Sequence, residues 1–264
     1  MDPETINRAF ALRKSGAMDE ALRLFRGAAA GASDPNDRAG VMLHEASCLI
    51  SLRRFDEAKT ALQRAREATQ DTWLGAYADQ QEAVIYMWEC RYEESLAVYD
   101  RLLATYPFIR EDARFRALFE SVQTERAILL STLHFAAKAL PALTDALSFN
   151  LSDPERGMVL YHLGRCFMTL KSFAKAKAAF EDLLKICQDR HCLLGARFSL
   201  GMIYAQQRIW GRALRDLRWC EQNCGDGDLP RRLLHEWLAK VLDATGSPAE
   251  AKRYRAMMDI VDVA

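Results

Sequence analysis

Apolar residues recur three and four positions apart along most of the chain, which is the spacing of one face of an α-helix. In one example, Leu160, Leu163 and Phe167 fall on a single stripe, and a second stripe runs from Phe173 to Leu183. One pair of helices cannot bury two such stripes alone. The pattern therefore predicts helix pairs that pack against further pairs, and it shows no alternation typical of strands.

The same helix pair recurs along the sequence. The segment Leu163-Gly164-Arg165-Cys166-Phe167 is followed 37 residues later by Leu200-Gly201-Met202-Ile203-Tyr204. A small residue near the start of each second helix can mark the copies, although a lysine stands in the fourth. The markers are Ala21, Ala58, Ser95, Lys138, Ala176, Ala213 and Ala251, at intervals of 37, 37, 43, 38, 37 and 38 residues. This spacing predicts seven helix pairs.

The pattern resembles the tetratricopeptide repeat (TPR), whose consensus is W-x2-L-G-x2-Y, then A-x3-F, then P. Leu200-Gly201-x2-Tyr204, Ala21-x3-Phe25 and Ala176-x3-Phe180 match parts of it literally. The usual period of the family is about 34 residues, so this chain resembles a long-period variant of about 37. The resemblance implies an all-α fold, an α-solenoid of about seven antiparallel helix pairs in a TPR-like right-handed superhelix.

We expect one TPR-like solenoid domain over residues 1–264. The longest interval, between Ser95 and Lys138, predicts either an extended helix, which we favour, or a boundary between two sub-arrays near residues 107–118. Helix starts are expected where Asp precedes Pro, because Asp caps helix N-termini and Pro suits the first helical position. These places are Asp2-Pro3, Asp34-Pro35 and Asp153-Pro154, and Ser152 with Glu155 has capping-box spacing.

The charge balance argues against a dedicated nucleic-acid binder, which needs a basic face. The chain has 36 basic and 36 acidic residues. Up to Thr132 there are 17 basic and 21 acidic residues, and after it 19 and 15. This asymmetry lies within ordinary scatter, but it would orient an acidic partner toward the C-terminal half.

Nothing in the sequence suggests a membrane or an export signal. No uninterrupted apolar stretch approaches the roughly 20 residues of a membrane-spanning helix. The segment Met1-Asp2-Pro3-Glu4 is acidic and polar, whereas a secretory signal is basic and then apolar. We therefore expect a cytoplasmic protein without a membrane partner.

The cysteines and histidines do not form a recognisable site. Cys187, His191 and Cys192 invite comparison with a zinc cluster, but the spacing is poor, and Cys187 and Cys224 occupy equivalent positions of successive copies. We expect reduced structural thiols, most of them buried, with no metal and no cofactor. The histidines are scattered and no nucleophile motif accompanies them, so we expect no enzyme activity.

Arg208, Arg212, Arg215 and Arg218 share one side of the second helix in the sixth pair. They suit either a phosphate or acidic tail, or a solvated surface, and we favour the solvated surface. The apolar C-terminal segment from Met257 to Val263 suggests a dimer contact, a fold-back or a missing continuation, of which we favour the fold-back.

The function that the resemblance implies is protein–protein interaction, as a module or scaffold that binds a peptide or amphipathic helix in a concave groove. One alternative is a peptide-sensing regulatory module or secretion-type chaperone. Another, which the charge disfavours, is a helical-repeat nucleic-acid binder. The partner is expected to be a protein or peptide, and a homodimer through the C-terminal helix stays open.

The resemblance also implies which residues line the groove, since TPR arrays use fixed positions of each first helix. The side chains are largely apolar and rich in methionine, which suits an adaptable surface. Transferred to this sequence, those positions and one neighbouring aromatic residue are Gln80, Val84, Met87, Trp88, Gln123, Tyr161, Arg165, Met168, Phe198 and Met202. An alternative is that the methionines belong to the core.

Overall fold

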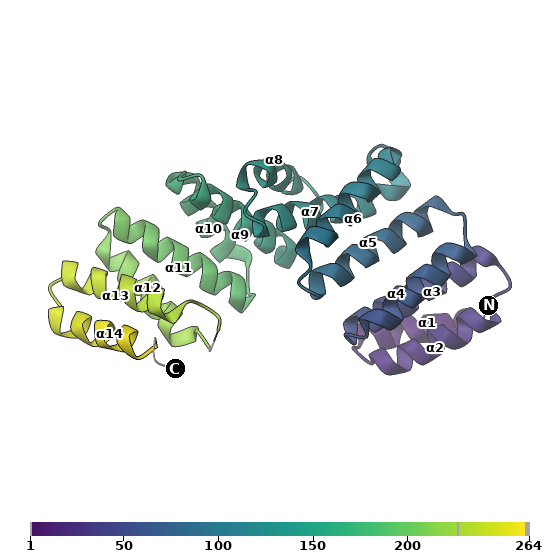
Figure 1. The fold of residues 1–264 in the computed structure, drawn as a ribbon, viewed down its shortest axis with the longest axis horizontal. Helices are drawn as coiled ribbons and strands as arrows, with labels where there is room; N and C mark the ends of the chain where they lie inside the picture. The colour runs from purple at the N-terminus through teal and green to yellow at the C-terminus, as the bar shows by residue number, and fades with distance from the viewer. Residues whose placement is uncertain (1, 226, 262–264) are drawn as a thin grey trace. The chain divides into compact units, whose positions relative to one another are not determined.

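The computed structural model describes residues 2–225 and 227–261, and within them it contains fourteen α-helices and no strand (Figure 1). This confirms the predicted all-α helical-repeat fold. In chain order the helices follow one another as seven helix–turn–helix pairs. They are α1 (Pro3–Lys14) and α2 (Met18–Gly31), α3 (Pro35–Ser51) and α4 (Phe55–Ala68), α5 (Thr72–Trp88) and α6 (Tyr92–Thr105), α7 (Arg116–Thr132) and α8 (Ala136–Ala146), α9 (Asp153–Thr169) and α10 (Phe173–Ile186), α11 (Arg190–Gln206) and α12 (Trp210–Asn223), and α13 (Arg231–Ala244) and α14 (Pro248–Val261).

The helices form two compact units, residues 1–129 and residues 130–264. We call them the N-terminal unit, which holds α1 to α6 and most of α7, and the C-terminal unit, which holds α8 to α14. Inside the N-terminal unit α3 packs against α2, α4 and α5, and inside the C-terminal unit α11 packs against α9, α10, α12 and α13. A single domain over residues 1–264 stays a prediction.

The favoured extended helix in the longest interval was wrong. The helix α6 ends at Thr105, and two short 3₁₀ turns, η1 (Pro107–Arg110) and η2 (Ala113–Phe115), precede α7. Pro107 has no backbone N–H and cannot continue a helix. Ile109 and Phe115 are buried and attach these turns to the core of the N-terminal unit.

The marker of the fourth copy was wrong by one residue. In the other six pairs the marker is the fourth residue of the second helix, as Ala58 is in α4 and Ala176 in α10, and both are fully buried. The fourth residue of α8 is Ala139, which is 0% exposed, whereas Lys138 is exposed. The second helices of the third and fourth pairs therefore begin 44 residues apart, at Tyr92 and Ala136.

Two of the three expected Asp caps are present. Asp2 accepts hydrogen bonds from the backbone of Glu4 and Thr5, and Asp34 caps α3 in the same way. Asp153 is instead the first residue of α9, so its assignment as the cap was wrong. Ser152 is the N-cap, and its backbone N–H donates to the Oε2 atom of Glu155 at 2.8 Å, as its capping-box spacing predicts.

Each turn inside a pair needs one residue with left-handed backbone geometry. In the first turn this residue is Gly16, whose N–H donates to the carbonyl of Arg13 while Ala17 donates to Leu12, a Schellman motif. The last turn uses Gly246 in the same place. In the five turns between them, residues other than glycine have φ values from 57° to 64°: Arg53, Cys90, His134, Lys171 and Arg208.

Replacing Lys171 with glycine should stabilise the protein by about 0.5–1 kcal/mol. A residue with a Cβ loses about 1–2 kcal/mol in this conformation, and the extra freedom of glycine in the unfolded chain offsets only part of that gain. Urea unfolding followed by circular dichroism measures the change. The matched control is Lys171→Ala, which removes the same charge but keeps a Cβ and should bring no gain; an equal gain from alanine would show that charge, not backbone strain, is responsible.

Glycine also permits close contact between the two helices of a pair. A Cβ built on Gly164 would lie 2.5 Å from the Cε1 atom of Phe180, and one on Gly201 would lie 2.8 Å from the Cδ2 atom of Leu217. Phe180 and Leu217 are both fully buried. The Leu-Gly motif of the repeat therefore makes room for the apolar residue that the second helix inserts.

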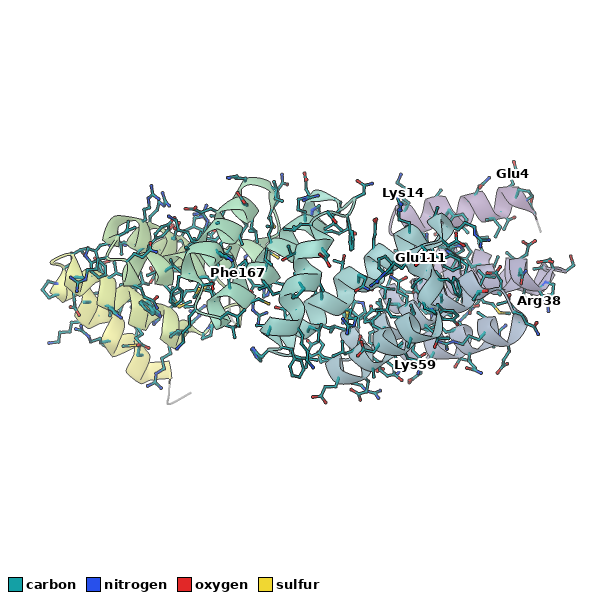
Figure 2. The ribbon with its side chains drawn as sticks, turned by 90° about the horizontal axis from the view of Figure 1, so that it is seen from above. Glu4, Lys14, Arg38, Lys59, Glu111 and Phe167 are labelled. Atoms are coloured by element: carbon teal, nitrogen blue, oxygen red, sulfur yellow. The ribbon has the colours of Figure 1, made fainter. Side chains whose placement is uncertain are left out.

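The surface is mostly polar. Figure 2 shows Glu4, Lys14 and Arg38 of the N-terminal unit, all of which are exposed. Over the residues that the structure describes, no helix is long and apolar enough to cross a membrane.

Candidate partner-binding surface

The first helices of the pairs can be aligned by their last residues. Position four from the end is Ser47 in α3, Val84 in α5, Arg165 in α9 and Met202 in α11. Because α3 packs on α5 and α9 packs on α11, equivalent positions lie on neighbouring helices within each unit. We call the residues eight, four and one before each helix end the first-helix face.

In the N-terminal unit, two of the predicted residues lie partly exposed on this face and one is buried. Val84 and Met87 are half-buried, and the neighbouring Trp88 is 49% exposed, with the Arg53 guanidinium 4.1 Å from its ring centroid. Gln80 is only 8% exposed, and its amide donates to the Ser121 hydroxyl at 2.8 Å. The Gln80 amide is therefore engaged inside the unit, and its contact with a partner stays a prediction.

Gln123 does not occupy the predicted position. The 44-residue step places Thr124, not Gln123, eight residues before the end of α7. Thr124 is buried and Gln123 is half-buried. The error has the same origin as the Lys138 marker, since both follow from the two 3₁₀ turns before α7.

The C-terminal unit brings four of its five predicted residues together on α9 and α11. Tyr161, Arg165, Met168 and Met202 are all half-buried, and the apolar ones pack against the core of the unit. Phe198 is 6% exposed and belongs to that core, and its part in a binding surface stays a prediction. The residue eight before the end of α11 thus faces the interior of the unit.

Tyr161 lies across α11 because that helix has a glycine beneath it. A Cβ on Gly195 would lie 2.5 Å from the Tyr161 ring. The Arg165 guanidinium lies 5.7 Å from the centroid of the same ring and forms no ion pair with any described residue. Burial raises the pKa of Tyr161, so its hydroxyl stays protonated near neutral pH.

Three features of this surface were missed from the sequence. Lys240 stands four residues before the end of α13, in the place of Met202, and its ammonium lies 4.5 Å from the Trp237 ring centroid. Met158, three residues before Tyr161, is 37% exposed. In the N-terminal unit, Trp73 stacks on Tyr77 with ring centroids 5.2 Å apart. Met158 and Tyr77 each stand three residues before a predicted groove residue, Tyr161 and Gln80. TPR arrays also use this earlier position of the first helix, and the sequence prediction did not include it.

Two of the buried thiols are not poised for chemistry. Burial raises the pKa of Cys192 and that of Cys220 to about 12, so both are protonated and unreactive at neutral pH. Cys187 and Cys224 occupy the same C-terminal cap position of α10 and α12, as predicted. Five cysteines are buried, whereas Cys224 is partly exposed and Cys90 is exposed. The described part of the chain contains no cluster of three His, Cys, Asp or Glu side chains that could hold a metal ion.

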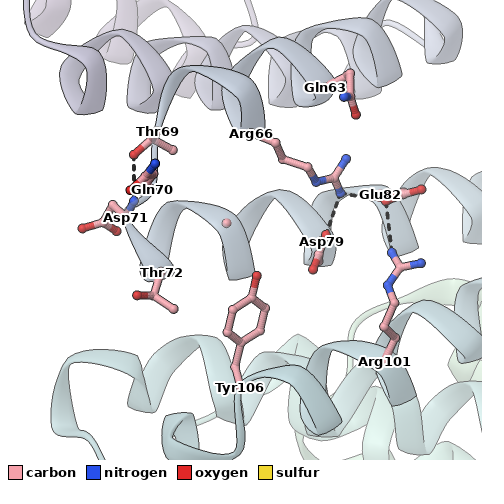
Figure 3. A pocket seen from close by; sticks show the side chains of 11 residues that line it. Gln63, Arg66, Thr69, Gln70, Asp71, Thr72, Asp79, Glu82, Arg101 and Tyr106 are labelled. Atoms are coloured by element: carbon pink, nitrogen blue, oxygen red, sulfur yellow. Dashed lines mark hydrogen bonds and ion pairs between the residues drawn. The ribbon is translucent and has the colours of Figure 1, made fainter.

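A polar pocket of about 690 Å³ lies elsewhere, in the N-terminal unit between α4, α5 and α6 (Figure 3). Arg66 is 2.7 Å from both Asp79 and Glu82, and Arg101 is 3.5 Å from Glu82. These charges pair with one another and connect the three helices, and no predicted groove residue lines the pocket. Its lining is Gln63, Arg66, Thr69, Gln70, Asp71, Thr72, Gly75, Asp79, Glu82, Arg101 and Tyr106.

Comparison with known families agrees with this geometry. A tetratricopeptide repeat model matches residues 12–79, and a second tetratricopeptide repeat model matches residues 159–190. The chain therefore contains tetratricopeptide repeats over these residues. Arrays of such repeats offer extended surfaces to other proteins. No curated protein matches the sequence.

Solved structures share the TPR fold at low sequence identity. Pseudomonas aeruginosa pilF is 18% identical with a TM-score of 0.65, and the match covers 86% of this chain and 93% of pilF. The signal-transduction ATPase PH0952 from Pyrococcus horikoshii, which has a tetratricopeptide repeat sensor, is 14% identical with a TM-score of 0.71, over 96% of this chain and 41% of that one. YrrB, a TPR protein with an unusual peptide-binding site, is 18% identical with a TM-score of 0.50, over 82% and 91% of the two chains.

Proposed function

We propose that this TPR protein binds an amphipathic segment of another protein on the first-helix face of its C-terminal unit. One observation carries the proposal: Met168 and Met202 are partly exposed on adjacent helices, next to an arginine that has no ion-pair partner among the described residues. Methionine side chains adapt to partners of different shape. The peptide-binding site of YrrB, on the same fold, agrees with this use.

The charges on this face define the ligand further. Arg165 on α9 and Lys240 on α13 each stand beside an aromatic ring, and neither forms an ion pair with a described residue. A ligand with apolar residues at helical spacing and a carboxylate beside them would satisfy both the methionines and Arg165. The same surface would serve the alternative role of a peptide-sensing regulatory module or secretion-type chaperone.

Changing both Met168 and Met202 to glutamate should abolish this binding. The introduced carboxylates would be buried against apolar ligand side chains, while the folded chain should lose no more than about 1 kcal/mol because both side chains are partly exposed. The measurement is fluorescence anisotropy with a peptide selected on the parent protein from a library of amphipathic sequences. Thermal unfolding monitors the fold.

The matched control is Met257→Glu on α14, which places the same charge at an exposed methionine away from this face. It should leave peptide affinity within about twofold of the parent, since distant surface changes act independently. A double variant that binds as well as the parent contradicts the proposal. A double variant that unfolds shows instead that the two methionines stabilise the core.

Other expectations from the sequence stay predictions. They include the absence of enzyme activity and of nucleic-acid binding, and the cytoplasmic location. Residues 262–264 lie outside the described residues and the side chains of residues 259–261 are not described, so the contact expected of the C-terminal segment is not placed.

A further inference from the structure

The second helices of the two units begin with opposite charges. In the N-terminal unit the third residue of α2, α4 and α6 is always glutamate: Glu20, Glu57 and Glu94. In the C-terminal unit the third residue of α8, α10 and α12 is Lys138, Lys175 and Arg212, and none of these helices has an acidic residue in its first turn. Only the last second helix of this unit, α14, returns to glutamate, with Glu250.

Helix stability does not explain this reversal. A helix N-terminus favours acidic side chains and disfavours basic ones, because the backbone N–H groups there carry partial positive charge. The glutamates of the N-terminal unit agree with this rule, and they also neutralise basic residues of the turns, with Arg54 2.7 Å from Glu57 and Arg91 2.9 Å from Glu94. The three cations at the third position of α8, α10 and α12 are unfavourable by the same rule.

The turns add two more cations at the same edge of the C-terminal unit. Lys171 and Arg208 are the left-handed turn residues that precede α10 and α12. We call the five residues Lys138, Lys171, Lys175, Arg208 and Arg212 the basic strip. All five are exposed, and none forms an ion pair with another residue of the described chain. The C-terminal unit carries 19 basic and 15 acidic residues, so its net charge of about +4 has the same sign.

Two acidic groups on the same second helices already have partners. Glu181 of α10 accepts a hydrogen bond from Tyr204 at 2.7 Å and lies 3.8 Å from Lys177. Asp216 of α12 is buried and bonded to Arg197 at 2.9 Å. The basic strip is therefore not balanced from within the unit, and it has unfilled capacity for carboxylates.

Aromatic rings hold the first-turn cations in place. The Lys175 ammonium lies 5.7 Å from the Phe167 ring centroid, and the Arg212 guanidinium lies 5.7 Å from that of Tyr204, exactly one repeat later in the chain. Lys138 lies 5.5 Å from the Phe135 ring. Cations held in this way lose less freedom when they meet a ligand.

Exposed apolar side chains alternate with these charges. Phe135 is 48% exposed, Leu170 is 43% exposed and Ile209 is 39% exposed, and each stands at the turn of a successive pair. A surface that alternates apolar and basic groups matches a chain that alternates apolar and acidic groups.

We propose that the basic strip binds an acidic segment of a partner protein that carries apolar residues between its carboxylates. A narrow chain can run along the turns and reach the exposed apolar side chains, the turn cations Lys171 and Arg208, and the cations in the first turns of the second helices. Nucleic acid is disfavoured, since two of the three exposed apolar side chains, Leu170 and Ile209, are aliphatic and offer bases no stacking surface.

The test uses a fluorescein-labelled peptide of repeated Glu-Leu-Asp units and measures anisotropy at about 50 and 150 mM salt, where screening differs. The triple variant Lys138→Glu, Lys175→Glu, Arg212→Glu restores the N-terminal unit's pattern and should fold, because it places acids at helix N-termini. It should lose at least about tenfold in affinity, as expected when several close charge pairs are reversed. Circular dichroism verifies the fold.

The matched control reverses three other exposed cations of the same unit, Lys185, Lys252 and Arg253, and changes the net charge equally. It should keep affinity within about threefold of the parent, as rim charges distant from the contact do. An equal loss in the control would overturn the proposal in favour of unspecific attraction. The other outcome is that the parent binds phosphatidylserine vesicles or single-stranded RNA and not the peptide. If the triple variant loses that binding, the proposal is overturned in favour of those ligands.

The basic strip and the first-helix face share no residue, so the two proposals can fail independently. The Met168→Glu, Met202→Glu variant should bind the acidic peptide as the parent does. If that variant loses the acidic peptide while the triple variant retains it, the acidic segment binds the first-helix face and the basic strip is not its site.

Discussion

Replacing Gly164 with alanine should destabilise the C-terminal unit by about 2–3 kcal/mol, because overpacking a well-packed core typically costs this much. The new Cβ would lie 2.5 Å from Phe180, closer than real Cβ contacts. Phe180 is fully buried and its ring cannot turn aside without moving its neighbours. Urea unfolding followed by circular dichroism measures the loss.

Two further variants separate the clash from helix propensity. Gly27→Ala in α2 has nothing within 4 Å of the new Cβ, and it should stabilise by up to about 1 kcal/mol, as alanine does in an exposed helix interior. Adding Phe180→Leu to Gly164→Ala should recover part of the loss, because it removes the Cζ ring atom that the new Cβ would meet at 2.6 Å. If Gly164→Ala is as stable as the parent, then the close contact with Phe180 does not require glycine at position 164, and the prediction is wrong.

Acidification should destabilise the protein strongly through His162. This side chain is 6% exposed, and burial, followed by the charges of Arg165 and His191, lowers its pKa to about 3. Since the folded pKa lies below the unfolded value of about 6.5, the unfolded chain binds more protons between these limits. The free energy of unfolding should therefore fall as the pH drops from 6.5 toward 3, by on the order of 4 kcal/mol for this residue.

Urea unfolding at several pH values measures this loss, and variants assign it. His162→Gln can keep a hydrogen bond to Ser131, whose hydroxyl lies 3.1 Å from the histidine Nδ1 atom, but it cannot take up a proton. The variant should be less stable at pH 7 and should show a smaller loss in acid. His191→Gln, at an exposed histidine, should follow the parent. A parent and a His162→Gln variant with the same pH dependence would contradict the assignment.

His44 should add to the acid loss in the N-terminal unit. Burial and the nearby Arg13 lower its pKa to about 4. Protonation of His44 should also lower the free energy of unfolding as the pH falls. His44 lies in the N-terminal unit, so this part of the acid loss should remain in the His162→Gln variant.

The repeat architecture could be predicted because its cause is local and periodic. A helix pair needs a small residue where its helices cross, and Ala58, Ala176 and Ala213 show that need at almost regular intervals. Places where the repeat interval changes are harder to predict, because a periodic pattern shows where a helix begins only as long as the interval stays the same. Around α7 the two 3₁₀ turns changed the interval to 44 residues, and the choice between Lys138 and its neighbour Ala139 could not be made from spacing alone.

The surface was predicted less well because exposure depends on how neighbouring helices pack. Tyr161 and Phe198 hold the same place in successive repeats, yet only Tyr161 is accessible. The position of the Tyr161 ring also depends on Gly195, a residue of a different helix, which spacing along the sequence does not reveal. The opposite charges at the starts of the second helices are visible in the sequence only once the register of α8 is known, which the Lys138 marker had obscured.

Gly195 also sets the position of the Tyr161 ring on the first-helix face before any ligand arrives. Because the Tyr161 ring is seated against α11, its rotamer is already selected, and a ligand that packs on it does not have to immobilise it. The ring also spans α9 and α11, so a change in the spacing of these helices would alter its surroundings. Tyr161 thus couples the shape of the surface to the stacking of two successive repeats.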